Sequence, residues 1–125
     1  CQKTGRCIIN DDAIGITEKI AEAEVVVWAT PIYYYEMTGQ MKTMIDRANA
    51  LFVKDYKFRD IYMLSTAAEE DASACERAIT GLKGWIACFP KSRFAGSVFA
   101  GGVTDKGDIS GHKALDEAYD LGRNA

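Results

Sequence analysis

A run of five consecutive apolar residues, Val25 to Ala29, constrains the fold of this chain more than any other segment. Three β-branched valines are followed by Trp28 and an alanine, with no polar residue between them. A strand with one face in water alternates apolar and polar residues, whereas a strand covered on both faces is continuously apolar. The run therefore predicts an internal strand of a parallel sheet, with helices packed on both faces.

The rest of the sequence alternates between helical and strand patterns. The expected strands cover 24–30, 60–66 and 93–100, and the expected helices cover 11–23, 39–53, 69–89 and 110–123. Strands and helices that alternate with right-handed crossovers produce an α/β domain with a doubly wound parallel sheet between two helix layers. A length of 125 residues without a break in composition indicates a single domain over residues 1–125.

Charge and hydropathy exclude several classes of partner. The net charge is -3 and no cluster of Lys or Arg occurs, so nucleic acid is not an expected partner. The longest apolar stretch, which begins at Val25, is too short to span a bilayer and contains Pro31. No membrane association is expected, and without a signal-peptide pattern the expected location is the cytoplasm.

The cysteines and the single histidine do not form a catalytic pattern. Cys1, Cys7, Cys75 and Cys88 contain no C-x-x-C pair, and Cys75 falls on the apolar stripe of a helix. Nothing in the sequence brings His112 near a cysteine, and the spacing of a metal hydrolase is missing. We therefore predict neither catalytic side chains nor metal ligands.

Ligands of open parallel sheets bind at the carboxyl ends of the strands. The first of these ends carries Tyr33, Tyr34 and Tyr35 between Pro31 and a Thr38-Gly39 helix start. Three adjacent tyrosines suit the face of a flat heterocycle, although they could equally fill a strand or a subunit interface.

Two further loops lie at the same predicted edge. Ser65 to Glu70 offers small residues and hydroxyls that leave room for a planar ligand, although Ser and Thr are also common helix caps. Gly101 to Asp108 is rich in glycine but lacks the spacing of a phosphate loop. We expect this third loop to be structural.

Several motifs in this order and spacing resemble those of the NAD(P)H-dependent FMN reductases of the flavodoxin-like superfamily. The closest likeness is to the branch of multimeric flavodoxins and iron–sulfur-flavoprotein-like proteins. The resemblance covers essentially the whole chain. The residues that carry it are Thr4-Gly5-Arg6-Cys7-Ile8-Ile9-Asn10-Asp11-Asp12, Pro31-Ile32-Tyr33, Lys42 with Asp46-Arg47, Gly101-Gly102-Val103 with Lys106-Gly107-Asp108-Ile109, and Ala118-Tyr119-Asp120-Leu121-Gly122.

The resemblance implies a flavodoxin-like fold that binds FMN, with the flavin ring between the first and second loops. It also implies NAD(P)H as co-substrate, a small-molecule electron acceptor or a redox protein as partner, and a homo-oligomer, either a dimer or a tetramer. Lys42, Asp46 and Arg47 would be architectural. The expected cofactor-binding residues are Thr30, Pro31, Ile32, Tyr33, Tyr34, Tyr35, Thr38, Gly39, Thr66 and Ala67.

Two departures from the family pattern limit these expectations. The family's opening strand and phosphate-binding loop have no counterpart here, so the sequence is expected to form an N-terminally truncated, partial domain. Relatives with a [4Fe–4S] cluster use four clustered cysteines, whereas only Cys1 and Cys7 occur in the corresponding region. We therefore expect no cluster.

Three functions of different classes remain open. The first is an FMN-dependent oxidoreductase that passes electrons from a nicotinamide to a small acceptor. The second is a non-enzymatic electron carrier of the flavodoxin type. The third is a folded remnant that binds no flavin. Rapid NAD(P)H oxidation without a protein partner would separate the first from the second, and bound flavin would eliminate the third.

Overall fold

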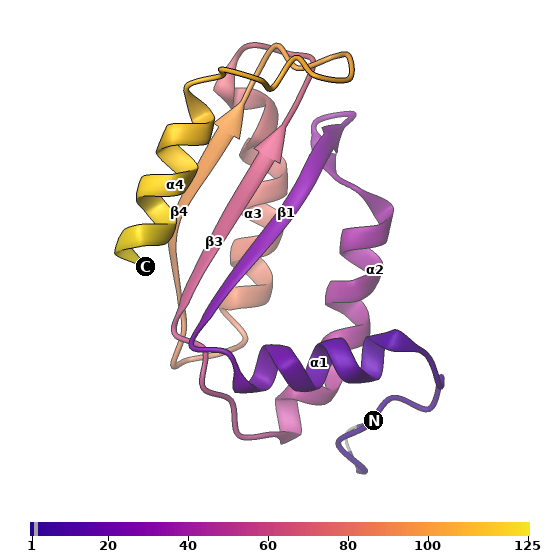
Figure 1. Cartoon of the computed structure of the whole chain (residues 1–125). Helices are drawn as coiled ribbons and strands as arrows, with labels where there is room; N and C mark the ends of the chain where they lie inside the picture. The colour runs from indigo at the N-terminus through magenta and orange to yellow at the C-terminus, as the bar shows by residue number, and fades with distance from the viewer. Residues whose placement is uncertain (2) are drawn as a thin grey trace.

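Three parallel strands and one short antiparallel strand form a single sheet in the order β2-β1-β3-β4 (Figure 1). The computed structural model describes residues 1 and 3–125. The strands are β1 (Val25–Tyr33), β2 (Glu36–Met37), β3 (Asp60–Thr66) and β4 (Arg93–Ala100). The helices are α1 (Asp12–Glu22), α2 (Gly39–Arg47), α3 (Glu76–Ile86) and α4 (Ala114–Asn124), with short 3-10 helices η1 (Ala48–Val53) and η2 (Ala72–Cys75). The predicted α/β class with a mostly parallel sheet is confirmed.

The two faces of the sheet are covered by different helices. Successive side chains of a strand point to opposite faces, so Trp28 and Met63 face one helix layer and Leu64 faces the other. The first face carries the larger core, where α3 supplies the fully buried Ala78 and Leu82. On the second face, Leu64 belongs to a smaller cluster with residues of β4 and α4.

The second face is covered over β3 and β4 and open over β1. Val27 lies on this side of β1 and is 47% exposed, which is unusual for a valine in a central run of apolar residues. The outer edge of β1 is also open, because within the described residues it pairs with β2 only at Ile32 and Tyr33. In the flavodoxin-like order 2-1-3-4-5, this edge adjoins the opening strand.

The structure corrects several predicted boundaries. The first strand continues to Tyr33, because the chain turns sharply there and pairs back as β2. The helix predicted at 39–53 becomes 3-10 after Arg47. The helix predicted at 69–89 begins later, because the Asp71 carboxylate accepts a hydrogen bond from Ser73 N at 2.8 Å and starts η2 instead. The last helix begins at Ala114 rather than Ser110.

A charged contact ties α1 to α2. Asp11 caps α1 by accepting from Ala13 N at 3.1 Å, and both its oxygens accept from Arg47 at 2.7 and 2.8 Å. Arg47 holds the pKa of the Asp11 carboxyl below its ordinary 3.8. Hydrogen bonds from Ile9 N and then from Arg47 also lower the pKa of the Cys7 thiol.

Lys42 and Asp46 pair at 2.6 Å on an exposed face of α2, where such a pair contributes about 0.3–0.5 kcal/mol.

We expect Asp11→Asn to lower stability at neutral pH and to flatten the acid limb of the stability curve. Because the folded pKa is depressed, the ion pair stabilises the native state above pH 3.8 and loses its effect as the pH falls through the lower folded value. Asparagine retains the capping oxygen, so the substitution removes the charge alone. Urea unfolding across this pH range measures the difference. Asp12→Asn, at a carboxylate with no ion pair among the described residues, serves as the control. An unchanged acid limb in Asp11→Asn would contradict the assignment.

Candidate functional site

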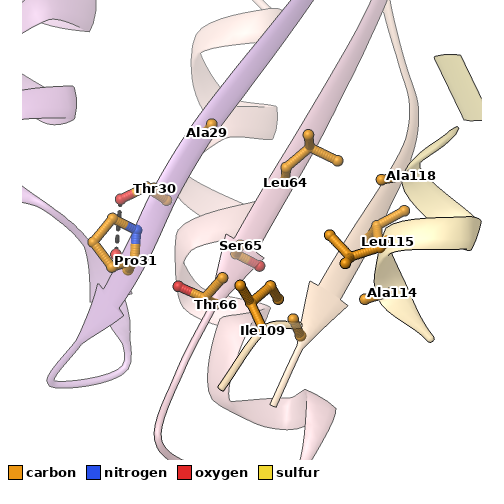
Figure 2. Close-up of a pocket in the computed structure, with 12 residues that line it drawn as sticks. Ala29, Thr30, Pro31, Leu64, Ser65, Thr66, Ile109, Ala114, Leu115 and Ala118 are labelled. Carbon is orange, nitrogen blue, oxygen red and sulfur yellow. Dashed lines mark hydrogen bonds between the residues drawn. The ribbon is translucent and has the colours of Figure 1, made fainter. Parts of the chain in front are cut away.

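The carboxyl ends of the three parallel strands meet at one edge of the sheet. The register pairs Pro31 with Thr66 and Thr66 with Ala100, so the tips lie side by side. Below them, between the sheet and α4, lies a cavity of about 380 Å³ (Figure 2). It is lined by Ala29, Thr30, Pro31, Leu64, Ser65, Thr66, Val98, Ala100, Ile109, Ala114, Leu115 and Ala118.

The cavity is apolar apart from its hydroxyl groups. None of the twelve described residues that line it carries an ionisable side chain. The polar side chains are Thr30, Ser65 and Thr66, all near the strand tips. Ser65 is 5% exposed, and its hydroxyl oxygen is buried without a hydrogen-bond partner among the described residues. Thr30 and Ser65 point to the α3 face, so the Thr66 hydroxyl is the one on the cavity side of its strand. Such a site can hold an apolar, flat group, but it supplies no charged acid or base.

Two threonines close the loop that follows β1. The Thr30 hydroxyl donates to Pro31 O at 2.8 Å and accepts from Thr38 N at 3.0 Å. The Thr38 hydroxyl accepts from Met41 N at 3.2 Å and caps α2, which begins at Gly39 as predicted. These bonds fix the position of Pro31 at the mouth of the cavity.

The tyrosine segment is a tight hairpin rather than an open loop. Tyr33 pairs with Glu36 across the turn, and the two central residues, Tyr34 and Tyr35, have φ of 52° and 64°. Positive φ at both central positions is typical of a type I′ turn, which normally contains Asn-Gly. Tyr33, Tyr34 and Tyr35 are 64%, 97% and 53% exposed. The hairpin therefore presents three aromatic side chains to solvent at the cost of a left-handed backbone.

The second and third loops are hydrogen-bonded to each other. Ala67 N donates to Ala100 O at 3.0 Å, and Val103 N donates to Ala67 O at 2.9 Å. A Cβ atom at Gly101 would lie 2.6 Å from Glu70 O, so only glycine fits there. The third loop is structural, as expected, because it holds the second loop in place.

His112 also has a structural position. Its Nδ1 accepts from Ala114 N at 3.1 Å, so the ring proton lies on Nε2, which donates to Gly101 O at 3.1 Å. The side chain therefore connects the start of α4 to the third loop. His112 falls within the helix predicted at 110–123, but it precedes α4 in the structure and is half-buried.

Asp108 lies in the turn that precedes His112. Its carboxylate accepts hydrogen bonds from Asp105 N at 2.7 Å and from Thr104 N at 3.1 Å. These two bonds lower the pKa of Asp108 and close the Thr104–Asp108 turn.

The structure brings only part of the predicted site together. Thr30, Pro31 and Thr66 line the cavity, whereas Ile32 and Ala67 are buried in the core on the α3 side. The tyrosines project from the hairpin, and Thr38 and Gly39 start α2 away from the lining. The lining residues from β4, α4 and the segment between them are not among the predicted site residues: Val98, Ala100, Ile109, Ala114, Leu115 and Ala118. Leu115 and Ala118 have the helical spacing of apolar residues within 110–123, which indicates a buried face without saying against what.

Neither a cluster of metal-ligating side chains nor a membrane-spanning helix occurs among the described residues. Among the residues that the structure describes, no three His, Cys, Asp or Glu side chains lie close enough to hold a metal ion. Cys1 is exposed and lies 3.6 Å from the amide nitrogen of Asn49, and Cys7 lies beside Arg47. Within the same residues, the helices are too short or too polar to cross a bilayer.

Comparison with protein families identifies the chain. The model of the NADPH-dependent FMN reductases matches residues 1–102. This chain belongs to the NADPH-dependent FMN reductase family. An iron-sulfur flavoprotein of Archaeoglobus fulgidus is 38% identical over 58 residues, which is 46% of this chain and 30% of that protein. The chain thus matches less than a third of the length of this curated relative.

Solved structures share the fold of this family member. The Trp repressor binding protein of Bacillus subtilis superposes with a TM-score of 0.70 at 24% identity, covering 88% of this chain and 75% of that one. An NAD(P)H:quinone oxidoreductase of Methanothermobacter marburgensis gives 0.64 at 18% identity, covering 98% and 66%. At these identities, the likeness establishes the flavodoxin-like fold.

We expect Gly101→Ala to destabilise this FMN reductase family member by about 1–3 kcal/mol, the typical cost of overpacking. The new methyl group would collide with Glu70 O and separate the second and third loops. Gly84→Ala is the matched control: Gly84 lies in α3 with open space at its Cβ position, and alanine there should stabilise by up to about 1 kcal/mol. Thermal and urea unfolding measure both changes. Equal stability of Gly101→Ala and wild type would contradict the close approach.

We expect the double substitution Tyr34→Asn, Tyr35→Gly to stabilise the chain by about 1–2 kcal/mol, because it relieves left-handed backbone at two residues. Tyr34→Phe, Tyr35→Phe retains the aromatic rings and the backbone, so it should leave the free energy of unfolding unchanged. Urea unfolding compares the three proteins. A loss of stability in the Asn-Gly variant would mean that the exposed rings contribute packing that outweighs the strain.

Proposed function

We propose that this chain forms the ring-binding part of an FMN site and functions as an FMN-dependent oxidoreductase that accepts electrons from NAD(P)H. The observation that carries this proposal is the apolar cavity at the tips of three parallel strands, with the Thr66 hydroxyl on its side of β3 and no ionisable lining residue. Membership of the NADPH-dependent FMN reductase family gives the chemistry that such a cavity would serve.

The cavity suits a flavin ring on three counts. Its volume of about 380 Å³ lies within the common range for ligand pockets, about 300–1,000 Å³. Thr66 lies on the cavity side of β3, so its hydroxyl can reach the polar edge of a ligand directly or through a bridging water. Tyr33 shares its face of β1 with Pro31 and Ala29, so its ring extends from the cavity mouth.

Each part of the chain has its own task in this proposal. Pro31, held by the Thr30 bonds, and Thr66 would form the two walls of the ring site, with the exposed tyrosines covering it from the hairpin. The hydrogen bonds between the second and third loops keep Thr66 in position. FMN, when bound, supplies the hydride and electron chemistry, and the protein orients it and excludes water. The absence of an ionisable group from the described lining agrees with a reaction that needs stacking more than proton transfer.

The remaining features of the function follow from the same proposal. NADH or NADPH would deliver a hydride, and a small molecule or a redox protein would receive the electrons. Exposed Tyr34 and Tyr35 suit a subunit contact in a dimer or tetramer. A cytoplasmic location suits a chain without disulfides among its described cysteines. The phosphate of FMN needs backbone N–H groups of the kind that the opening loop of the fold supplies.

A flavodoxin-type electron carrier is the alternative that the cavity also supports, since both functions need the same ring site. Steady-state oxidation of NAD(P)H with added FMN separates the two. Rapid turnover without a protein partner indicates the oxidoreductase, and flavin binding without such turnover indicates the carrier.

We expect Tyr33→Ala to weaken FMN binding. Loss of an aromatic contact costs about 0.5–1.5 kcal/mol, which corresponds to a Kd about 2- to 13-fold higher. Quenching of FMN fluorescence on titration with the protein measures the Kd directly. Tyr119→Ala is the matched control, because Tyr119 is similarly exposed, at 71%, but lies on α4 outside the cavity lining.

Equal weakening by the two substitutions would exclude a specific role for Tyr33. Absence of any quenching by the wild-type chain would overturn the flavin site. It would favour the third hypothesis, a folded remnant that binds no flavin.

A further inference from the structure

Five aromatic side chains on the α3 side of the sheet form a continuous series of ring contacts. This aromatic cluster consists of Trp28, Trp85, Phe58, Phe89 and Tyr56. Trp28 contacts Trp85 edge-on at a centroid distance of 5.7 Å. Trp85 then stacks on Phe58 at 5.9 Å, and Phe58 stacks on Tyr56 at 4.3 Å, with interplanar angles of 22° and 25°. Phe89 lies 4.9–5.4 Å from the other three rings of this stack.

The aromatic cluster connects the two ends of the sheet. Trp28 lies two residues before Thr30 on the α3 face of β1, about 6–7 Å from it along the strand, and the cavity lies on the opposite face of the sheet. Tyr56 lies in the segment between η1 and β3, at the amino-terminal end of the strands (Figure 1). It is half-buried, and its hydroxyl oxygen accepts from Lys91 N at 3.1 Å. The hydroxyl proton therefore remains available to solvent.

Packing alone is a poor explanation for the tryptophan at the inner end. The indole N–H of Trp28 is buried without an acceptor among the described residues. A buried donor without a partner costs about 1–3 kcal/mol, and a phenylalanine would fill apolar space without that cost. Indole and phenol are the aromatic side chains that give up one electron most readily. An oxidised Trp28 with no acceptor for its N–H proton would keep that proton and remain a strong oxidant of its neighbour.

A carboxylate offsets the positive charge nearest to the Tyr56 ring. The Lys91 ammonium lies 5.4 Å from the ring centroid, but it also pairs with Asp55 at 3.1 Å. Arg59 donates to the carbonyl oxygens of Lys57 and Phe58 at 2.8 and 2.9 Å, so its guanidinium is bound to the backbone of this segment. The Lys91 charge nearest the ring is thus balanced by a carboxylate.

We propose that the aromatic cluster is a relay that moves one-electron oxidation from the strand tips to the surface at Tyr56. An oxygen-centred radical formed at the tips takes one electron from Trp28 and is reduced. Trp85 then donates an electron to the oxidised Trp28, and Tyr56 donates one to the oxidised Trp85 across the Phe58 ring. Tyr56 releases its hydroxyl proton to water and remains as a neutral tyrosyl radical, which a solvent reductant can quench. The relay rests on the proposed flavin site only for the source of the radical.

Pulse radiolysis with the azide radical tests the relay on the chain without any flavin. The azide radical oxidises tryptophan, and the tryptophyl and tyrosyl radicals are distinguished by their absorption. We expect the tryptophyl signal to convert to a tyrosyl signal in a first-order phase that is independent of protein concentration. Tyr56→Phe should abolish this phase, and Trp85→Phe should leave a long-lived radical on Trp28. Circular dichroism checks that both variants are folded.

Tyr62→Phe is the matched control, because Tyr62 is also half-buried but makes no ring contact with the aromatic cluster in the described structure. It should retain the phase, as should the triple substitution Tyr33→Phe, Tyr34→Phe, Tyr35→Phe. Retention of the phase in Tyr56→Phe, or a rate that rises with protein concentration, would overturn the relay. Neither outcome affects the FMN titration, so failure of the relay and failure of the flavin site are distinguishable.

Discussion

The parallel register of β1, β3 and β4 is the constraint on which the rest of the structure depends. Seven consecutive residues of β1 pair with β3, and the last of these pairs, Pro31 with Thr66, fixes where the two strands end. Parallel pairing places the loops that follow every strand at one edge. The positions of the cavity, the tyrosine hairpin and the hydrogen-bonded second and third loops all follow from that geometry.

The two faces of the sheet differ in how much of the core they carry. On the α3 side, alternate residues of the strands meet α3 and form an extensive core that includes the aromatic cluster. On the α4 side, Val98, Ala100 and Ala114 form a small cluster, and the cavity continues from it toward β1. The stability of the chain therefore comes mainly from one face, while the other face retains the space in which a ligand can bind.

Backbone details at the strand tips favour exposure of aromatic rings over local stability. Left-handed φ at Tyr34 and Tyr35 is costly for a side chain with a Cβ atom, and glycine or asparagine would adopt it more easily. Strained residues of this kind persist where the surroundings hold them, and they are common at functional sites. Here the Thr30–Thr38 hydrogen bonds and the β1–β2 pairing hold the hairpin closed. The unpartnered Ser65 hydroxyl lies at the same tips.

Element type could be predicted from the sequence, because the periodicity of apolar residues is a local property. The strands at 60–66 and 93–100 have the predicted bounds, and the helices were placed in the correct order. Their ends were less predictable, because Asp71 and His112 make hydrogen bonds that stop or delay a helix and that no pattern of apolar residues reveals. The tyrosine hairpin escaped prediction for a similar reason: a type I′ turn is expected from Asn-Gly, not from two tyrosines.

The sequence by itself determined the α/β class, the parallel strands and the three loops at their carboxyl ends, since these depend on the order and spacing of apolar and polar residues. Only the tertiary structure decided which side chains share a cavity. Ile109, Leu115 and Ala118 are far from Thr30 in the chain, and they reach it only because α4 docks against the second face of the sheet. That docking depends on the summed packing of many side chains, and no single motif encodes it.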